Sequence, residues 1–197
     1  MTRPRAERLV VAITGASGAP YARRLLEVLR RLRAQGIGPE VAVVASATAP
    51  EVWTLECGGE LRAGVEPFPL WKGRDYGAPF ASGSAGWDAM VVVPCSMSTV
   101  ARIAHGASDS LLTRAADVMI KERRNLIVVP RESPLSAIHL ENLLVLARLG
   151  VTVAPAMPSF YGQAASLEAL LDTVIARLLD HLGLANELAP RWGVARP

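Results

Sequence analysis

The sequence predicts an α/β protein with a doubly wound, mainly parallel open sheet, and three observations support this fold class. Short apolar runs alternate with segments in which apolar residues recur at helical spacing. Several of these runs end at glycine or proline, as strands that are buried on both faces do. The 197 residues are 51% hydrophobic and 20% charged, which is enough apolar material for one large core.

The first strand and helix form the clearest pair. Residues 9–13 are a continuous apolar run that ends at Thr14-Gly15, so we expect a buried strand there. Pro20 stands where a first helical turn begins. From residue 21 to 33 the leucines and valines recur at helical spacing, and Gly36 then ends the predicted helix.

The same alternation continues along the chain. We expect further strands at 41–45, 89–93, 126–129 and 151–154, and helices at about 46–57, 96–105, 111–121, 136–149 and 166–182. Ser46 is placed to cap the second helix. Strands that alternate with helices pair in parallel through right-handed crossovers, so we expect a three-layer, Rossmann-like or flavodoxin-like domain.

The chain is expected to form one domain over residues 1–184, followed by a tail over 185–197. The tail carries Trp192, which we expect to dock at an oligomer contact or at the active site. Residues 58–88 interrupt the alternation and are rich in glycine, proline and aromatic residues. Because long irregular stretches are uncommon in compact domains, we expect this one to be a lid or a subunit contact.

Composition and charge argue against several classes of protein. The net charge of +3 comes without a long Lys/Arg tract, so we expect no nucleic-acid partner. No apolar run reaches the ~20 residues that span a bilayer, and no signal peptide is recognisable, so we expect a cytoplasmic protein with no membrane partner. Cys57 and Cys95 fit a reducing compartment, and the three histidines lack ligand spacing, so no metal site is expected.

Polar loops follow four of the predicted strands, at the edge where open parallel sheets bind ligands. These loops are residues 14–17, Ser46, residues 96–99 and Arg131-Glu132. The first places Gly15, Ala16 and Ser17 at a helix start, where unpaired N–H groups and the helix dipole favour phosphate. It lacks the lysine of a P-loop and the G-x-G-x-x-G spacing of a dinucleotide site, so we expect the phosphate of a mononucleotide.

The residues Ser96-Met97-Ser98-Thr99 stand at another helix start. Simple capping of that helix is one explanation. Four polar or soft residues in a row are more than a cap requires, so hydrogen bonding to the edge of a flavin ring is the other.

Seven longer strings occur in order along nearly the whole chain. They are Thr14-Gly15-Ala16-Ser17-Gly18-Ala19, Ala81-Ser82-Gly83-Ser84, Pro94-Cys95-Ser96-Met97-Ser98-Thr99, Lys121-Glu122-Arg123-Arg124, Val129-Pro130-Arg131-Glu132, His139-Leu140-Glu141-Asn142 and Pro190-Arg191-Trp192-Gly193. Together they resemble the flavin prenyltransferases of the UbiX type. That family belongs to a wider group of homo-oligomeric flavoproteins that includes phosphopantothenoylcysteine decarboxylase.

The resemblance implies an activity. Members of the family join a dimethylallyl unit, from dimethylallyl phosphate or pyrophosphate, to reduced FMN, and a fourth ring forms across flavin N5 and C6. A partner decarboxylase of the UbiD type then uses the prenylated FMN, and a link to ubiquinone biosynthesis is implied with it. The resemblance also implies a homo-oligomer, expected to be a homo-dodecamer of trimers.

The resemblance also implies roles for individual residues. Those expected to hold FMN are Gly15, Ala16, Ser17, Ser46, Ser96, Met97, Ser98, Thr99 and Arg131. Those expected to hold the prenyl phosphate are Tyr161, Arg177, Lys121 and Arg114. Those expected near the chemistry are Glu132, Glu56, Lys121, Ser82 and Trp192. The match is weakest over residues 58–80, so no lid contact is carried over there.

The chemistry of the implied prenyl transfer explains why these types of residue are expected at the site. Breaking an allylic C–O bond leaves negative charge on phosphate, which Lys121, Arg177 and Arg114 would neutralise. Glu132 would protonate the leaving phosphate. Each has an ordinary alternative: Lys121 and Arg177 as solvated surface residues, and Glu132 as the partner of a nearby arginine. The aromatic residues from Trp71 to Trp87, with Trp192, would line the pocket of the allyl cation or would be core or interface aromatics.

Two other functions remain open on the sequence. An FMN-dependent decarboxylase of cysteinyl peptides shares the Pro94…Ser96…Thr99 string, but the histidine base typical of that chemistry is absent from the first helix. A flavin-binding regulatory subunit without catalysis would be expected to lack the set of Lys, Glu and Arg residues, which is intact here.

Overall fold

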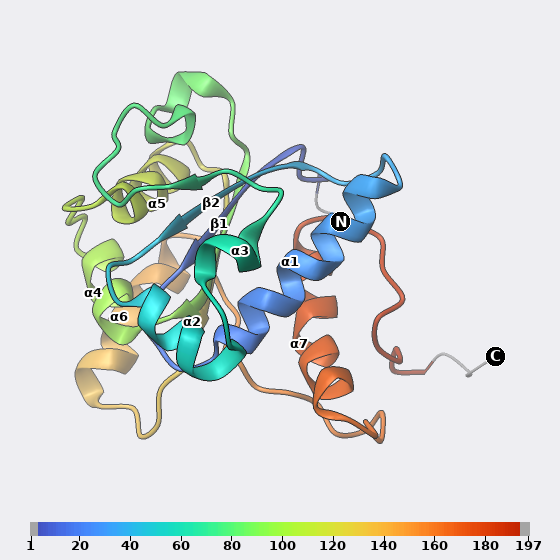
Figure 1. The fold of residues 1–197 in the computed structure, drawn as a ribbon. Helices are drawn as coiled ribbons and strands as arrows, with labels where there is room; N and C mark the ends of the chain where they lie inside the picture. The colour runs from blue at the N-terminus through green and yellow to red at the C-terminus, as the bar shows by residue number, and fades with distance from the viewer. Residues whose placement is uncertain (1–3, 194–197) are drawn as a thin grey trace.

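The computed structural model describes residues 4–193 and confirms the α/β prediction. Within that range six strands form one sheet in the order β3-β2-β1-β4-β5-β6, and every neighbouring pair is parallel (Figure 1). The strands are β1 (Arg8–Ile13), β2 (Glu40–Ala45), β3 (Leu70–Trp71), β4 (Ala89–Cys95), β5 (Asn125–Pro130) and β6 (Thr152–Val153). The order reverses between β1 and β4, which places the topological switch point of a doubly wound sheet there.

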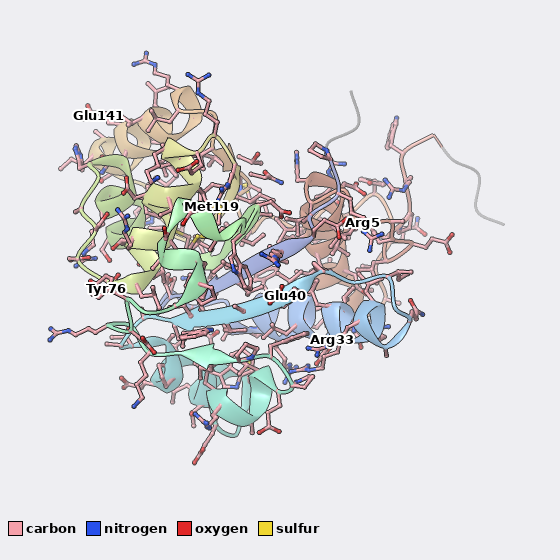
Figure 2. The ribbon with its side chains drawn as sticks, turned by 90° about the horizontal axis from the view of Figure 1, so that it is seen from above. Arg5, Arg33, Glu40, Tyr76, Met119 and Glu141 are labelled. Carbon is pink, nitrogen blue, oxygen red and sulfur yellow. The ribbon has the colours of Figure 1, made fainter. Side chains whose placement is uncertain are left out.

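Helices cover both faces of the sheet. One face carries α1 (Ala19–Ala34), α2 (Ala49–Cys57), α3 (Leu61–Val65) and α7 (Leu167–His181), and the other carries α4 (Met97–Ala104), α5 (Leu111–Lys121) and α6 (Ala137–Arg148). Figure 2 shows the layers from above, with Arg33 of α1 on one side of the sheet and Met119 and Glu141 on the other. No helix of the described part of the chain is long and apolar enough to cross a membrane.

Alternate residues of each strand feed two separate cores. In β1, Leu9 and Val11 pack with α1 and α7, whereas Val10 and Ala12 pack with α4 and α5. All four are fully buried. This is why the strands read as continuous apolar runs rather than as alternating ones.

Serine side chains start several of the helices. Ser96 and Ser166 cap α4 and α7, and Ser110 and Ser136 form capping boxes for α5 and α6. The expectation that Ser46 caps the second helix is wrong. Thr48 is the N-cap of α2 and makes no side-chain capping bond, because the chain runs on for two more residues before turning.

The expectation for residues 58–88 also needs correction. The stretch contains α3 and the edge strand β3, whose Leu70 and Trp71 pair in parallel with β2. Its aromatic side chains pack edge to face, with ring centroids 6.0 Å apart for Trp71–Phe80 and 5.7 Å apart for Phe80–Trp87. Phe80 and Trp87 are buried in the core on the α5 side, so these two aromatic residues belong to the core, and a role of the stretch as a lid or subunit contact stays a prediction.

Candidate active site

A cavity of about 520 Å³ opens at the carboxyl ends of β1, β2 and β4, beside the switch point. Its volume falls in the range of small-molecule sites, about 300–1,000 Å³. Five of the predicted FMN-binding residues line it: Gly15, Ser46, Ser96, Ser98 and Thr99. The structure therefore brings three of the four predicted polar loops to one place.

Thr14 ties two of these loops together. Its buried hydroxyl donates to the carbonyl of Pro94 at 2.7 Å and accepts from the backbone N–H of Ser96 at 3.0 Å. Gly15 follows it, and a Cβ atom there would lie 2.0 Å from Thr48 Oγ1. Glycine is needed at 15 because the start of α2 approaches the β1 loop so closely.

The Ser96–Thr99 turn both caps α4 and lines the cavity. Ser96 Oγ accepts from the backbone N–H of Thr99 at 3.3 Å and lies 3.2 Å from Ser98 Oγ and 3.0 Å from Thr99 Oγ1. The capping explanation is confirmed for Ser96, and hydrogen bonding of these hydroxyls to a flavin ring stays a prediction. Met97 differs, because its side chain is buried in the core and the residue does not line the cavity.

The start of α1, where the sequence predicts phosphate, already holds a carboxylate of this chain. Glu56 Oε2 accepts from the backbone N–H groups of Gly18 and Ala19, both at 2.8 Å. Burial raises the pKa of Glu56, but hydrogen bonds from the Ser17 hydroxyl and the two N–H groups, with the charge of Arg131, outweigh it and leave that pKa below its ordinary value. The structure thus places Ser17, Glu56 and Arg131 together and puts an anion at this helix start.

Arg131 and Glu132 follow β5 at the same edge of the sheet. Both side chains are exposed, and Glu132 Oε1 accepts from the backbone N–H of Ser133 at 3.0 Å. The Arg131 charge also acts on Tyr21, whose pKa burial raises. These positions leave both residues free to face a ligand.

The predicted residues Arg114, Lys121 and Ser82 lie elsewhere. Lys121 ends α5 and pairs with Glu122, and a Cβ atom on Gly83, next to Ser82, would meet that same Glu122. Arg114 donates to the carbonyl of Ala81 at 3.1 Å. Lys121 and Glu122 directly precede β5, whose six residues span roughly 20 Å, so they lie at the amino ends of the strands, away from Glu132. Arg114 differs, because it follows Thr113 of the cavity lining in the first turn of α5, although it does not line the cavity itself.

Tyr161, Arg177 and Trp192 form a third group. They line a cavity of about 460 Å³ together with Asp180. The rings of Tyr161 and Trp192 meet edge to face with centroids 5.4 Å apart, and Arg177 pairs with Asp180 at 3.0 Å. The loop that carries Tyr161 is joined to the end of β5, because the N–H of Ala156 donates to the carbonyl of Pro130.

Sequence reasoning missed six polar residues of the first cavity. They are Thr48, Arg74, Arg102, Asp109, Ser110 and Thr113. A signal existed for Arg102, because it follows Ser98 by four residues and so shares its helix face. No such periodicity marks Arg74, which enters from the loop after β3.

The lining of the first cavity fits FMN. Hydroxyls from three loops suit the ribityl chain and ring edge, two arginines suit a phosphate, and the walls include Ala45 and Leu112 for apolar contact. Among residues 4–193, no cluster of three or more His, Cys, Asp or Glu side chains is arranged to hold a metal ion.

The comparisons with known proteins identify the class of protein to which this chain belongs. The model of the flavoprotein family matches residues 2–179. The chain is 42% identical to a flavin prenyltransferase UbiX of Pseudomonas aeruginosa, over 95% of this chain and 94% of that one. It is 45% identical to a flavin prenyltransferase UbiX of Thermoplasma acidophilum, over 94% of this chain and 99% of that one.

Solved structures agree with these relatives. AnUbiX (PadA1) in complex with FMN and dimethylallyl pyrophosphate superposes with a TM-score of 0.89 at 41% identity, covering 98% of this chain and all (100%) of that one. A dodecameric FMN-dependent UbiX-like decarboxylase from Escherichia coli O157:H7 gives 0.88 at 42% identity, covering 95% and 100%. The chain is a flavoprotein of the α/β class. Within that class it belongs to the UbiX-type flavin prenyltransferases.

Proposed function

We propose that this protein joins a dimethylallyl unit to reduced FMN. Dimethylallyl phosphate, or the pyrophosphate, loses its phosphate group, and bonds form from the allyl unit to flavin N5 and C6. The observation that carries the proposal is the FMN-sized cavity at the switch point, with Ser17, Glu56 and Arg131 grouped at the same edge of the sheet.

The residues at this edge take distinct parts in the proposal. The cavity hydroxyls and the loop from Gly15 to Ser17 hold and orient FMN. The ionised Glu56 and the Ser17 hydroxyl form a pair that holds and moves a proton next to the ring. Glu132 donates a proton to the leaving phosphate, and Tyr161 with Arg177 binds that phosphate in the second cavity.

A homo-oligomer completes the proposed site. Lys121 ends α5 at the amino ends of the strands, and neither Arg114 nor Ser82 lines the FMN cavity, so a neighbouring copy supplies these three residues in the proposal. Exposed apolar side chains support an assembly of copies: Trp192 is 82% exposed, Phe160 and Met157 are each 73% exposed, and Ile138 of α6 is 67% exposed. By analogy with the dodecameric relative, we propose a dodecamer in which the tail over 185–193 meets a neighbour. Residues 194–197 of the predicted tail lie outside the described residues.

The rest of the proposal concerns the setting of the reaction. We propose that a decarboxylase of the UbiD type takes up the prenylated FMN, in the cytoplasm, with ubiquinone biosynthesis as one use. The alternative of cysteinyl-peptide decarboxylation has no specific support here, since the FMN-dependent cysteine decarboxylase SpaF shares only the fold, at 20% identity and a TM-score of 0.58.

Anaerobic incubation of the purified protein with reduced FMN and dimethylallyl phosphate tests the activity. Mass spectrometry of the released flavin is expected to show a gain of C5H8, with inorganic phosphate as co-product. Glu132→Gln is expected to slow the reaction by about 10²–10³-fold, in the range of a lost preorganised catalytic group. If the protein binds FMN but the mass of the flavin is unchanged after the incubation, the proposal is refuted.

A further inference from the structure

Two arginines outside the predicted set line the FMN cavity. Arg102 comes from α4 on one side, and Arg74 comes from the loop after β3 on the other. Among residues 4–193, Asp109 is the only acid of this lining, so the ionised side chains leave one net positive charge. A phosphate monoester carries about −1.5 to −2 charges at neutral pH, so an excess of positive charge suits it.

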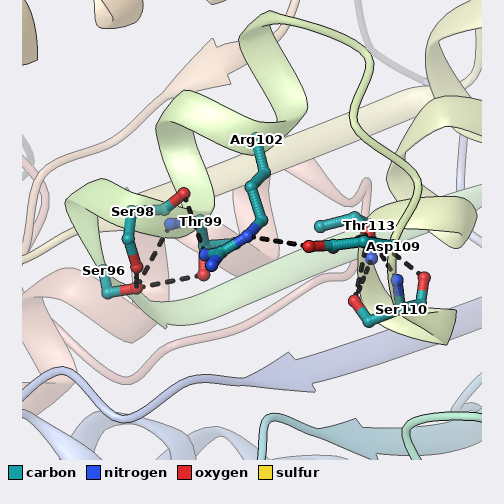
Figure 3. Close-up of polar contacts among 7 residues, drawn as sticks. All are labelled: Ser96, Ser98, Thr99, Arg102, Asp109, Ser110 and Thr113. Atoms are coloured by element: carbon teal, nitrogen blue, oxygen red, sulfur yellow. Dashed lines mark hydrogen bonds and ion pairs between the residues drawn. The ribbon is translucent and has the colours of Figure 1, made fainter.

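Arg102 is held in place by its neighbours. Its Nε donates to Asp109 Oδ2 at 3.1 Å, and its Nη1 donates to the carbonyl of Ser98 at 3.3 Å. Asp109 is in turn fixed, because its Oδ1 accepts from the Thr113 hydroxyl at 3.2 Å. Figure 3 shows the guanidinium between the hydroxyls of Ser96 and Ser98 on one side and Asp109 with Ser110 on the other. Its remaining N–H groups are available to an anion beside those hydroxyls.

Arg74 differs from Arg102 in having no partner within the described part of the chain. Its side chain is exposed, and neither a hydrogen bond nor an ion pair holds it among residues 4–193. Its backbone is nevertheless fixed, because Gly73 accepts from the N–H of Leu111 at 2.7 Å. The loop therefore delivers an uncompensated guanidinium to the cavity.

The other anion site of this edge is already filled. The N–H groups of Gly18 and Ala19 at the start of α1 bond to the ionised Glu56, which would repel a second anion. The hydroxyls of Ser46 and Thr48, by contrast, lie 3.4 Å apart and line the same cavity as the two arginines. Charge thus favours the phosphate at the arginine side of the cavity.

We propose that Arg74 and Arg102 are the residues that select FMN over riboflavin. Both guanidinium groups bind the phosphate at the end of the cavity formed by Ser46, Thr48 and Ser98, with Arg102 preset by Asp109 and Arg74 closing onto the ligand. The flavin ring and ribityl chain bind elsewhere in the cavity and do not depend on either arginine. This selectivity for FMN over riboflavin concerns binding alone, and it does not require that the protein transfers a prenyl group.

The test measures dissociation constants of oxidised FMN and of riboflavin on flavin-free protein, by quenching of flavin fluorescence. Arg74→Ala and Arg102→Ala are each expected to weaken FMN about 10-fold, the loss of one charge-assisted hydrogen bond. Riboflavin binding should stay within about twofold of the parent protein, since it has no phosphate. Arg102→Lys should keep part of the selectivity, and rising salt should weaken FMN only.

Two control variants sharpen the test. Arg148→Ala removes an equally charged exposed side chain at the end of α6 and should change neither constant. Glu56→Gln should leave the ratio of the FMN and riboflavin dissociation constants unchanged. If the FMN phosphate bound at the start of α1 instead, loss of the Glu56 charge would tighten the binding of FMN relative to riboflavin. Three results would overturn the proposal. Both ligands could be weakened equally, only one of the two arginine variants could lose selectivity, or neither variant could change the two dissociation constants. The binding measurement separates this failure from failure of the prenyl transfer.

Discussion

At the scale of single residues, Gly15 is fixed by a contact rather than by its backbone angles. Its Cβ position lies 2.0 Å from Thr48 Oγ1 and 2.7 Å from Thr48 Cβ. We expect Gly15→Ala to lower the free energy of unfolding by about 1–3 kcal/mol, the usual cost of overpacking. Urea denaturation at fixed protein concentration measures this.

The compensating change is Thr48→Gly, which removes both clashing atoms. Thr48 makes no side-chain capping bond, so glycine at this N-cap should cost only a few tenths of a kcal/mol by itself. The double variant is therefore expected to regain most of the stability lost in Gly15→Ala. A double variant no better than the single one would show that the contact is not the cause.

Glu56 gives a prediction that depends on pH. Because its pKa is lowered in the folded protein from an ordinary 4.5, its ionised form stabilises the fold above that value, and the stabilisation is lost as the pH falls through the lowered pKa. Glu56→Gln keeps an acceptor for Gly18 and Ala19 but loses the charge at the α1 start. We expect it to destabilise the protein by about 1 kcal/mol at neutral pH and by little in acid.

The matched control is Glu141→Gln, which removes an exposed carboxylate from the middle of α6, away from a helix start. Its unfolding free energy should follow the parent protein across the same pH range. A Glu56→Gln effect that persists unchanged in acid would mean that packing, not charge, explains it.

Some features of the candidate site are predictable from the sequence and others are not, and the difference has a physical cause. The glycine and hydroxyl residues of the cavity are predictable, because they stand next to strand ends in one polar loop each. The occupation of the α1 start by Glu56 is not, because that carboxylate comes from another helix, 38 residues further on than Gly18. Contacts between elements have no local pattern in the sequence.

At the scale of elements, a buried ion cluster fastens α7 to α1. Arg24 makes two bonds to Asp172, at 2.6 and 2.9 Å, and their side chains are only 10% and 11% exposed. Asp172→Ala would leave the Arg24 charge with Glu27 and Glu168 alone. Since breaking a buried pair costs about 3–5 kcal/mol, we expect a loss of about 2–4 kcal/mol in unfolding free energy.

An exposed ion pair of the same chain provides the comparison. Arg8 and Glu40 meet at 3.1 Å with side chains 47% and 61% exposed, so Glu40→Gln should cost less than about 1 kcal/mol. Chemical denaturation of both variants in parallel separates the two cases. Equal losses would contradict a special role for the cluster at α7.

Elements with strong periodicity are predictable from the sequence, whereas the edge strand β3 is not. The helix expected at 111–121 is observed as α5 with the same bounds, because its amphipathic pattern and its serine cap agree. The strands β3 and β6 have two residues each, and β6 lies within the strand expected at 151–154, whereas the sequence predicts no strand at β3. Strands that short carry no periodicity of their own and depend on pairing with β2 and β5.

At the scale of the whole molecule, one chain cannot bring its predicted catalytic residues together. Lys121 and Arg177 lie in different clusters, and Lys121 lies at the amino ends of the strands, away from the FMN cavity. Assembly in which copies meet through different surfaces brings such residues into one site. We therefore propose that the activity belongs to the oligomer and that each site is shared between copies.

Mixed oligomers test this sharing directly. Lys121→Ala and Arg177→Ala are each expected to be inactive, because each removes one phosphate-binding cation from every site. If the two residues of a site come from different copies, random co-assembly of the two variants leaves about a quarter of the sites intact, so about a quarter of the parent activity should return. Co-expression with two affinity tags isolates the mixed oligomers, and the rate of C5H8 transfer to FMN is the readout. Lys121→Ala co-assembled with a chain carrying both substitutions is the control, since no site can then regain its lysine. Activity that stays absent in the first mixture as well would place both residues in one chain and refute the shared site.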